Sequence, residues 1–203
     1  TMAGSTSVRS AVQRYGHELR RRVAVSGDEG PKFIEMLLDR AISPDEGRGC
    51  LSIIWAASSL LSEEERRAAS QLAMPVITDR RAERDDRIAA VHLAPLEAPG
   101  QDVCEALKSI VTDRGDDPQV RRAAIRLSAE LRCVWAESEL LRIVQDERYL
   151  DYSPIMRSAC VGLAKLDAAQ GIPAIGHVLA ETEQSDVFAS AAASLSLFGT
   201  RDC

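Results

Sequence analysis

Two runs of apolar residues separated by a short polar turn make up residues 101–132. The first run holds Val103, Leu107, Ile110 and Val111, and the second holds Val120, Ala123, Ala124, Leu127 and Leu131. Spacings of three and four place each run on one face of an α-helix. The turn contains Asp117 followed by Pro118, which is typical of a helix start, because the carboxylate caps the first N–H groups and proline fits the first helical position. The segment therefore predicts a helix, a turn and a second helix.

The same pattern returns along the chain. A short apolar segment that ends in an acid recurs every 33 to 40 residues, and in the first four copies an arginine follows the acid after eight to eleven residues. The acids are Asp39, Asp79, Asp113, Asp146 and Glu181, and the arginines are Arg48, Arg87, Arg121 and Arg157, with Phe188 in the fifth copy. Repeats of this length predict stacked helix pairs, since one pair cannot bury its apolar face alone.

We predict an all-α fold: an α-solenoid of about five stacked antiparallel helix pairs with an N-terminal amphipathic capping helix. The repeat domain covers residues 31–199, with units at approximately 31–61, 63–97, 101–132, 135–167 and 170–199. Ser43-Pro44 and Ser153-Pro154 repeat the capped start seen at Asp117-Pro118. Ser62 ahead of three glutamates predicts another helix start, with the acids at the positive end of the helix dipole.

An amphipathic helix is predicted over residues 7–25, after a flexible N-terminus of residues 1–6 in which Thr1 ahead of Met2 is typical of a cloning remnant. Its apolar face is Val8, Val12, Tyr15, Leu19 and Val23, and arginines occupy the other face. A basic amphipathic helix can bind a membrane surface or phosphates. We favour a cap over the first repeat, because solenoid ends need covers.

The helix-ending acids, the Asp117-Pro118 turn and the Val120-Arg121 pair followed by Ala123-Ala124 resemble the HEAT-like repeat family of α-solenoids. Met156-Arg157 followed by Ala159 extends the resemblance into the fourth unit. The resemblance implies a structural ladder of Asp and Arg between neighbouring repeats, made here by Asp39, Asp79, Asp113, Asp146, Arg48, Arg87, Arg121 and Arg157. It implies no single activity, because one branch of the family excises damaged DNA bases and another attaches bilin pigments.

The composition and charge of the chain disfavour several classes of function. The chain of 203 residues has a net charge of −6, which disfavours nucleic acid as a partner, although a local basic groove remains compatible with it. No apolar run approaches the roughly 20 residues of a membrane span, and no secretory signal is apparent. The five cysteines are far apart in the sequence and form no metal-binding or redox motif, so a cytoplasmic, reducing location is expected.

Little in the sequence indicates catalysis. His17, His92 and His177 lie in separate units, and neither a Gly-rich phosphate loop nor a nucleophile elbow is present. We therefore predict no catalytic residue, no metal ligand and no cofactor. The leading hypothesis is a non-catalytic scaffold or adaptor that binds a protein partner. The alternative is a HEAT-like enzyme that acts on DNA bases or a protein similar to the bilin lyases.

The most distinctive candidate binding element is the turn over residues 147–152, which is longer than its counterparts and carries Arg148, Tyr149 and Tyr152. Tyrosine is favoured at protein interfaces, so these side chains are candidates for partner contact. The alternative is that Tyr149 and Leu150 fold back as a cover over the adjacent repeat. Further candidate contacts on neighbouring second helices are Arg122, Arg126 and Lys165; a solvated helix face is the simpler account of the two arginines.

Overall fold

The computed structural model describes residues 36–37, 49–96, 100–149 and 153–198, and these residues form α-helices, 3-10 helices and turns without any strand. This confirms the all-α prediction for the described part of the chain. The predicted helix over residues 7–25 and the ladder positions Asp39 and Arg48 lie outside the described residues. The chain divides into two compact units, residues 1–100 and 101–203.

The first unit contains α3 (Cys50–Ala56), α4 (Glu63–Thr78) and α5 (Arg84–Leu93), with 3-10 turns at Ser58–Leu60 and Ala94–Leu96. α4 begins with a capping box: the Ser62 hydroxyl accepts from the Glu65 N–H at 3.3 Å, and the Glu65 carboxylate accepts from the Ser62 N–H at 2.7 Å. The helix start predicted at Ser62 is therefore confirmed. α5 packs against both α3 and α4.

A buried carboxylate joins α5 to the start of α3. Asp86 accepts a hydrogen bond from the Gly49 N–H at 2.7 Å and another from the Ser52 hydroxyl at 3.4 Å. Gly49 precedes α3 with a φ of 79°, in the left-handed region that favours glycine. Burial raises the pKa of Asp86 above its usual value, while these hydrogen bonds oppose the rise.

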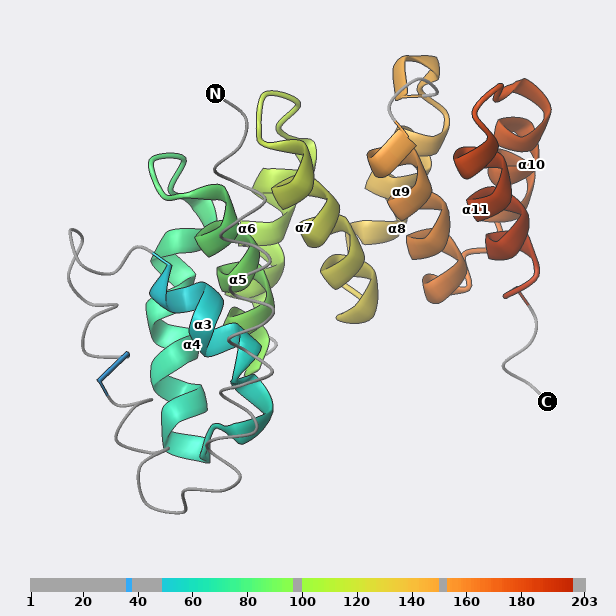
Figure 1. Cartoon of the computed structure of the whole chain (residues 1–203). Coiled ribbons are helices and arrows are strands. Elements are labelled where there is room, and N and C mark those ends of the chain that lie inside the picture. Colours follow the sequence, from blue (N-terminus) through green and yellow to red (C-terminus); the bar gives the residue numbers. More distant parts are fainter. Residues whose placement is uncertain (1–35, 38–48, 97–99, 150–152, 199–203) are drawn as a thin grey trace. The chain divides into compact units, whose positions relative to one another are not determined.

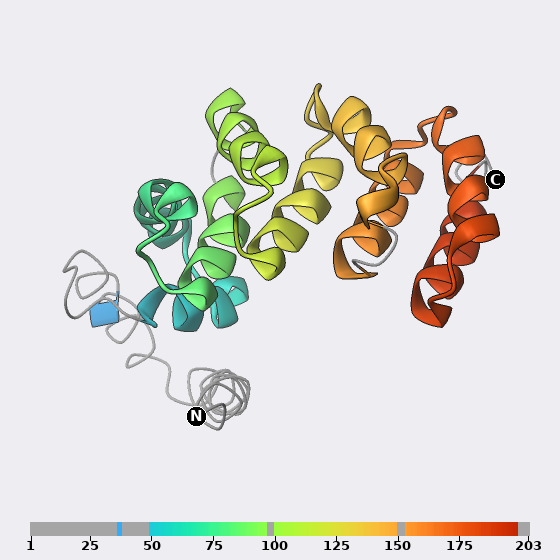
Figure 2. The same ribbon diagram turned by 90° about the horizontal axis from the view of Figure 1, so that it is seen from above.

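The second unit contains three helix pairs: α6 (Gln101–Thr112) with α7 (Pro118–Glu130), α8 (Ala136–Val144) with α9 (Ser153–Leu166), and α10 (Gly171–Glu181) with α11 (Ser185–Leu195). A 3-10 turn at Glu147–Tyr149 lies between α8 and α9. Figure 1 and Figure 2 show the two helices of the later pairs side by side. The second helices, α7, α9 and α11, also pack on one another in this order.

The predicted helix start at Asp117 is confirmed: its carboxylate accepts from the N–H groups of Gln119 and Val120, and Pro118 opens α7. The core of the unit is apolar. Each first helix contributes large buried side chains, such as Leu107, Leu140 and Ile175, and the second helices contribute Ile125 and Leu163. Burial of such side chains supplies the main stabilisation of the pairs.

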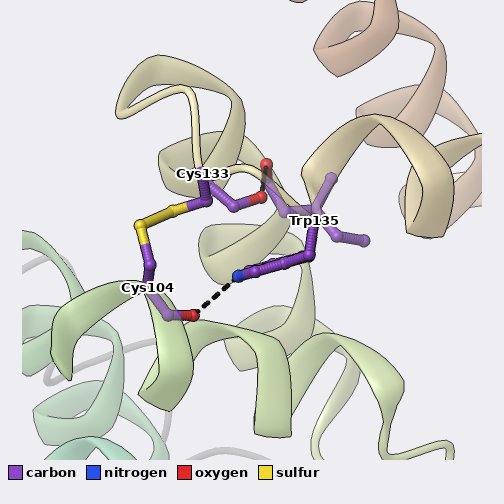
Figure 3. The surroundings of a disulfide bond; sticks show 5 residues. Cys104, Cys133 and Trp135 are labelled. Atoms are coloured by element: carbon purple, nitrogen blue, oxygen red, sulfur yellow. Dashed lines mark hydrogen bonds between the residues drawn. A yellow bond between two sulfur atoms is a disulfide. The ribbon is translucent and has the colours of Figure 1, made fainter. Parts of the chain in front are cut away.

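A disulfide joins the first pair of this unit (Figure 3). Cys104 on α6 and Cys133, just after α7, lie 29 residues apart in sequence with their Cα atoms 5.7 Å apart. The Trp135 indole N–H donates to the Cys104 carbonyl at 3.0 Å beside it. The antiparallel packing of α6 and α7 brings the start of one helix next to the end of the other, so cysteines that are distant in sequence meet.

The sequence analysis missed this pairing and expected the reduced cysteines of a cytoplasmic protein. A disulfide is the state that an oxidising environment favours, so the cytoplasmic location stays a prediction that the bond does not support. Cys50 and Cys160 are buried elsewhere. Within the described ranges, no helix has the length and apolar character needed to cross a membrane.

Candidate binding pocket

Three of the recurring acids, Asp79, Asp113 and Asp146, follow the first helix of a pair and cap the turn after it. Asp79 accepts from the Arg81 N–H, Asp113 from the Gly115 N–H and Asp146 from the Arg148 N–H, at 2.9, 2.9 and 3.2 Å. In all three the carboxylate bonds to the backbone two residues on, the pattern of an Asx turn. The spacing found in the sequence therefore has a local cause within each pair.

Two of the recurring arginines are buried under the same turns. Arg87 donates from Nε and a terminal nitrogen to the Ile77 carbonyl, both at 3.2 Å, and Arg121 donates to the Val111 carbonyl at 3.0 Å. The acceptor stands ten residues before the arginine in both units. The last carbonyls of a helix have no partner within the helix, so each arginine caps the first helix of its own pair.

Three side-chain contacts in the second unit join neighbouring pairs. Arg121 donates to the Tyr149 hydroxyl of the next pair at 3.1 Å. Asp146 forms an ion pair with Arg114 of the preceding pair at 2.7 Å. Arg157, the fourth arginine of the series, lies at the surface of α9 and pairs with Asp186 of α11 at 3.1 Å.

The turn that was the leading candidate binding element is partly a structural cover. Tyr149 is only 7% exposed, and its ring lies 5.5 Å from the guanidinium carbons of both Arg114 and Arg121. This burial leaves little of the Tyr149 side chain for a partner to contact, and its role in partner binding stays a prediction. Tyr152 lies outside the described residues.

Arg148 in the same turn is exposed and forms an ion pair with Asp146 at 2.8 Å. Its hydrogen bond, assisted by Arg114, lowers the pKa of Asp146 to about 2. Lys165, another candidate contact, pairs with Glu130 of α7 and is not among the residues that line the pocket described below.

A surface pocket of about 250 Å³ lies along the second helices of the second unit. α7 contributes two arginines, α9 contributes the central residues, and α11 contributes an acid and a serine. We call it the arginine pocket; its lining residues are Arg122, Arg126, Pro154, Arg157, Ser158, Val161, Asp186 and Ser190. The structure therefore brings Arg122 and Arg126 together with Arg157, which the sequence analysis assigned to the ladder.

The charges of the pocket are unbalanced. Among the described residues that line it, three guanidinium groups face one carboxylate, which is the Asp186 partner of Arg157. Arg122 lies within 3.5 Å of the Gln119 side-chain oxygen, while Arg126 is exposed and pairs with no acid in the described part of the chain. Like charges four residues apart on a helix destabilise it by about 0.2–0.5 kcal/mol. Arg122 and Arg126 thus maintain a positive surface at a cost to α7.

The described residues offer little for catalysis or metal binding. No three His, Cys, Asp or Glu side chains gather among them in a way that could hold a metal ion. His92 stacks on Trp55 with ring centroids 4.5 Å apart. Burial raises the pKa of the Cys160 thiol to about 12, which keeps it protonated and unreactive.

Sequence reasoning found Arg122 and Arg126 but missed Arg157, Asp186 and the two serines as parts of one site. These side chains meet because α7, α9 and α11 lie in one row. A comparison of the outward-facing positions of these three helices in the sequence was the signal that could have indicated a shared site. No protein-family model, curated protein or solved structure matches the chain.

Proposed function

We propose that this chain is a non-catalytic scaffold or adaptor for a protein partner, that its helix pairs stack as a HEAT-like α-solenoid, and that the arginine pocket is part of the binding surface. The packing supports the stacking: in the second unit each first helix contacts its second helix, and the second helices contact one another in order. Stacked repeats present such rows of helices as extended binding surfaces.

The pocket is the observation that carries the proposal. It opens on three consecutive second helices, and its lining combines arginines with small side chains such as Ser158 and Ser190. Arginine is enriched at protein interfaces because its planar fork makes several hydrogen bonds at once. A cluster of three on one row of helices is a candidate anchor for a partner.

The alternative of an enzyme that acts on DNA bases has less support. A flipped base needs side chains that stack on it and a group that activates water. None of the described residues that line the pocket is aromatic, and its one carboxylate already pairs with Arg157. A bilin also exceeds the site, because pockets for ligands of that size measure roughly 300–1,000 Å³.

Affinity purification tests the proposal. Tagged wild-type chain and the double variant Arg122→Glu/Arg126→Glu are used as baits in the native cell. A matched control, Arg66→Glu/Arg67→Glu, makes the same change of charge on exposed residues of α4. We expect one set of proteins to co-purify with the wild type and the control and to be lost with the pocket variant. Equal capture by all three baits would contradict the proposal.

A further inference from the structure

We infer that the arginine pocket accepts a phosphorylated serine or threonine side chain of the partner. This inference rests on the proposed function, because it names the group that the same surface recognises. The pocket joins three guanidinium groups and one carboxylate, Asp186, and it is formed by side chains of α7, α9 and α11.

The charge of the pocket favours a phosphoryl group over a carboxylate. Among the described lining residues, three arginines and one aspartate leave a net charge of about +2. A phosphorylated side chain carries about −1.5 to −2 at neutral pH, whereas a glutamate or aspartate carries −1. A phosphoryl group thus balances the pocket, and it offers three acceptor oxygens to guanidinium groups, which bind phosphate bidentately.

The size of the pocket limits the ligand to a side chain. A volume of about 250 Å³ is below the range of about 300–1,000 Å³ that is usual for drug-sized molecules and cofactors. The pocket is open and lies along packed helices, so a peptide backbone can run outside it while one phosphorylated side chain enters. Val161 and Pro154 supply the apolar part of the wall.

Asp186 is the acid that pairs with Arg157 before an anion binds. It holds Arg157 through an ion pair whose two side chains are both about half exposed, 47% and 49%. Exposed ion pairs of this kind contribute little to stability, so Arg157 can exchange its carboxylate partner for a phosphoryl group at small cost. Removal of the Asp186 charge should then strengthen anion binding, since a repelling charge next to the ligand is lost.

The first experiment measures binding of O-phosphoserine to the full chain by NMR, with the arginine Nε–Hε signals as the readout. Glutamate is the monoanionic comparison, and sulfate is a dianion that does not titrate near neutral pH. We expect O-phosphoserine to bind more tightly than glutamate at pH 7.5 and to weaken at pH 5.5, below the second phosphate pKa near 6, while sulfate binding stays constant.

Variants then locate the site. Arg122→Ala and Arg126→Ala should each weaken O-phosphoserine binding about tenfold, because each removes a charge-assisted hydrogen bond. Asp186→Asn should tighten it about fivefold. Arg66→Ala/Arg67→Ala on α4 is the control and should leave it unchanged. Equal affinity for glutamate, or equal affinity in all variants, would identify an adventitious ion only and overturn the inference.

The second experiment separates this inference from the proposed function. Partner capture is repeated after phosphatase treatment of the lysate. Loss of capture both with the Arg122→Glu/Arg126→Glu variant and on phosphatase treatment supports the inference. Capture that needs the arginines but survives phosphatase leaves the proposed function standing and overturns the inference. Capture that needs neither overturns both, as does tighter binding of duplex DNA than of any phosphopeptide to the same arginines.

Discussion

Arg87 in the first unit and Arg121 in the second unit make the same cap with different geometry. Each is less than 5% exposed and donates to a carbonyl ten residues earlier. Arg87 donates from Nε and from a terminal nitrogen to the Ile77 carbonyl. Arg121 donates from one terminal nitrogen to both the Val111 carbonyl and the Tyr149 hydroxyl. The Nε of Arg121 has no hydrogen-bond partner in the described structure.

In the second unit, the neighbouring helix pair takes part in the cap through Tyr149. The Tyr149 hydroxyl accepts from the same terminal nitrogen of Arg121 that donates to the Val111 carbonyl, and the Nε of Arg121 has no acceptor in the described structure. A buried polar atom without a partner costs about 1–3 kcal/mol. The second unit therefore carries a buried N–H without a partner and also a disulfide that joins its first two helices. Substitutions at these contacts test how each of them stabilises its unit.

The largest expected effect is that of the disulfide. The double change Cys104→Ala/Cys133→Ala should lower the free energy of unfolding of the second unit by about 3 to 4 kcal/mol, because the bond closes a loop of 29 residues. Hydrogen exchange should speed up in α6 and α7 and stay unchanged in α4 and α5. Reductant should reproduce the effect in the wild type; rapid alkylation of both cysteines in the untreated native protein would show that the bond is not formed.

The next effect is that of the buried arginines. Arg121→Ala and Arg87→Ala should each cost about 2 to 3 kcal/mol, since each leaves a buried carbonyl without its donor. Arg122→Ala, a change at the adjacent residue in the pocket, should cost less than about 0.5 kcal/mol. Urea titrations give all three values. If Arg87→Ala left the free energy of unfolding unchanged, the arginine cap would not stabilise the first unit as it does the second.

The loss of the Tyr149 hydroxyl should have a smaller effect on stability. Tyr149→Phe keeps the buried ring and removes the hydroxyl, so it should cost about 1 kcal/mol, and less if the released Arg121 shifts toward the geometry of Arg87. Tyr149→Ala, which also removes the buried aromatic ring, should cost more than Tyr149→Phe. Thermal unfolding of the two variants checks the order. A Tyr149→Ala variant as stable as the wild type would return Tyr149 to the role of a binding residue.

The smallest effect is one of pH. Arg148 lowers the pKa of Asp146 from 3.8 to about 2 in the folded chain. A lowered pKa gives stability that is present above pH 4 and is lost as the pH falls toward 2. Arg148→Ala should raise the pKa of Asp146 toward 3.8, as an NMR titration of the carboxylate would detect. Arg142→Ala, on the exposed side of α8, should not change it.

The amino-acid sequence alone determined the all-α character of the described residues and two helix starts. The all-α fold followed from apolar spacings of three and four, and the starts at Ser62 and Asp117 followed from capping residues. These signals succeed because a cap and its target N–H groups lie within one helical turn. The clustering of Arg122 and Arg126 was also visible, since residues four apart share a helix face.

The tertiary structure decided everything that depends on a second helix. Arg157 follows Pro154 by three residues as Arg121 follows Pro118, yet Arg121 is buried against Tyr149 and Arg157 lies in the pocket beside Asp186. Identical local spacing cannot distinguish these fates, because burial depends on which neighbouring helix covers the side chain. The Cys104–Cys133 bond has the same cause: only the antiparallel packing of α6 and α7 brings residues that are 29 positions apart to bonding distance.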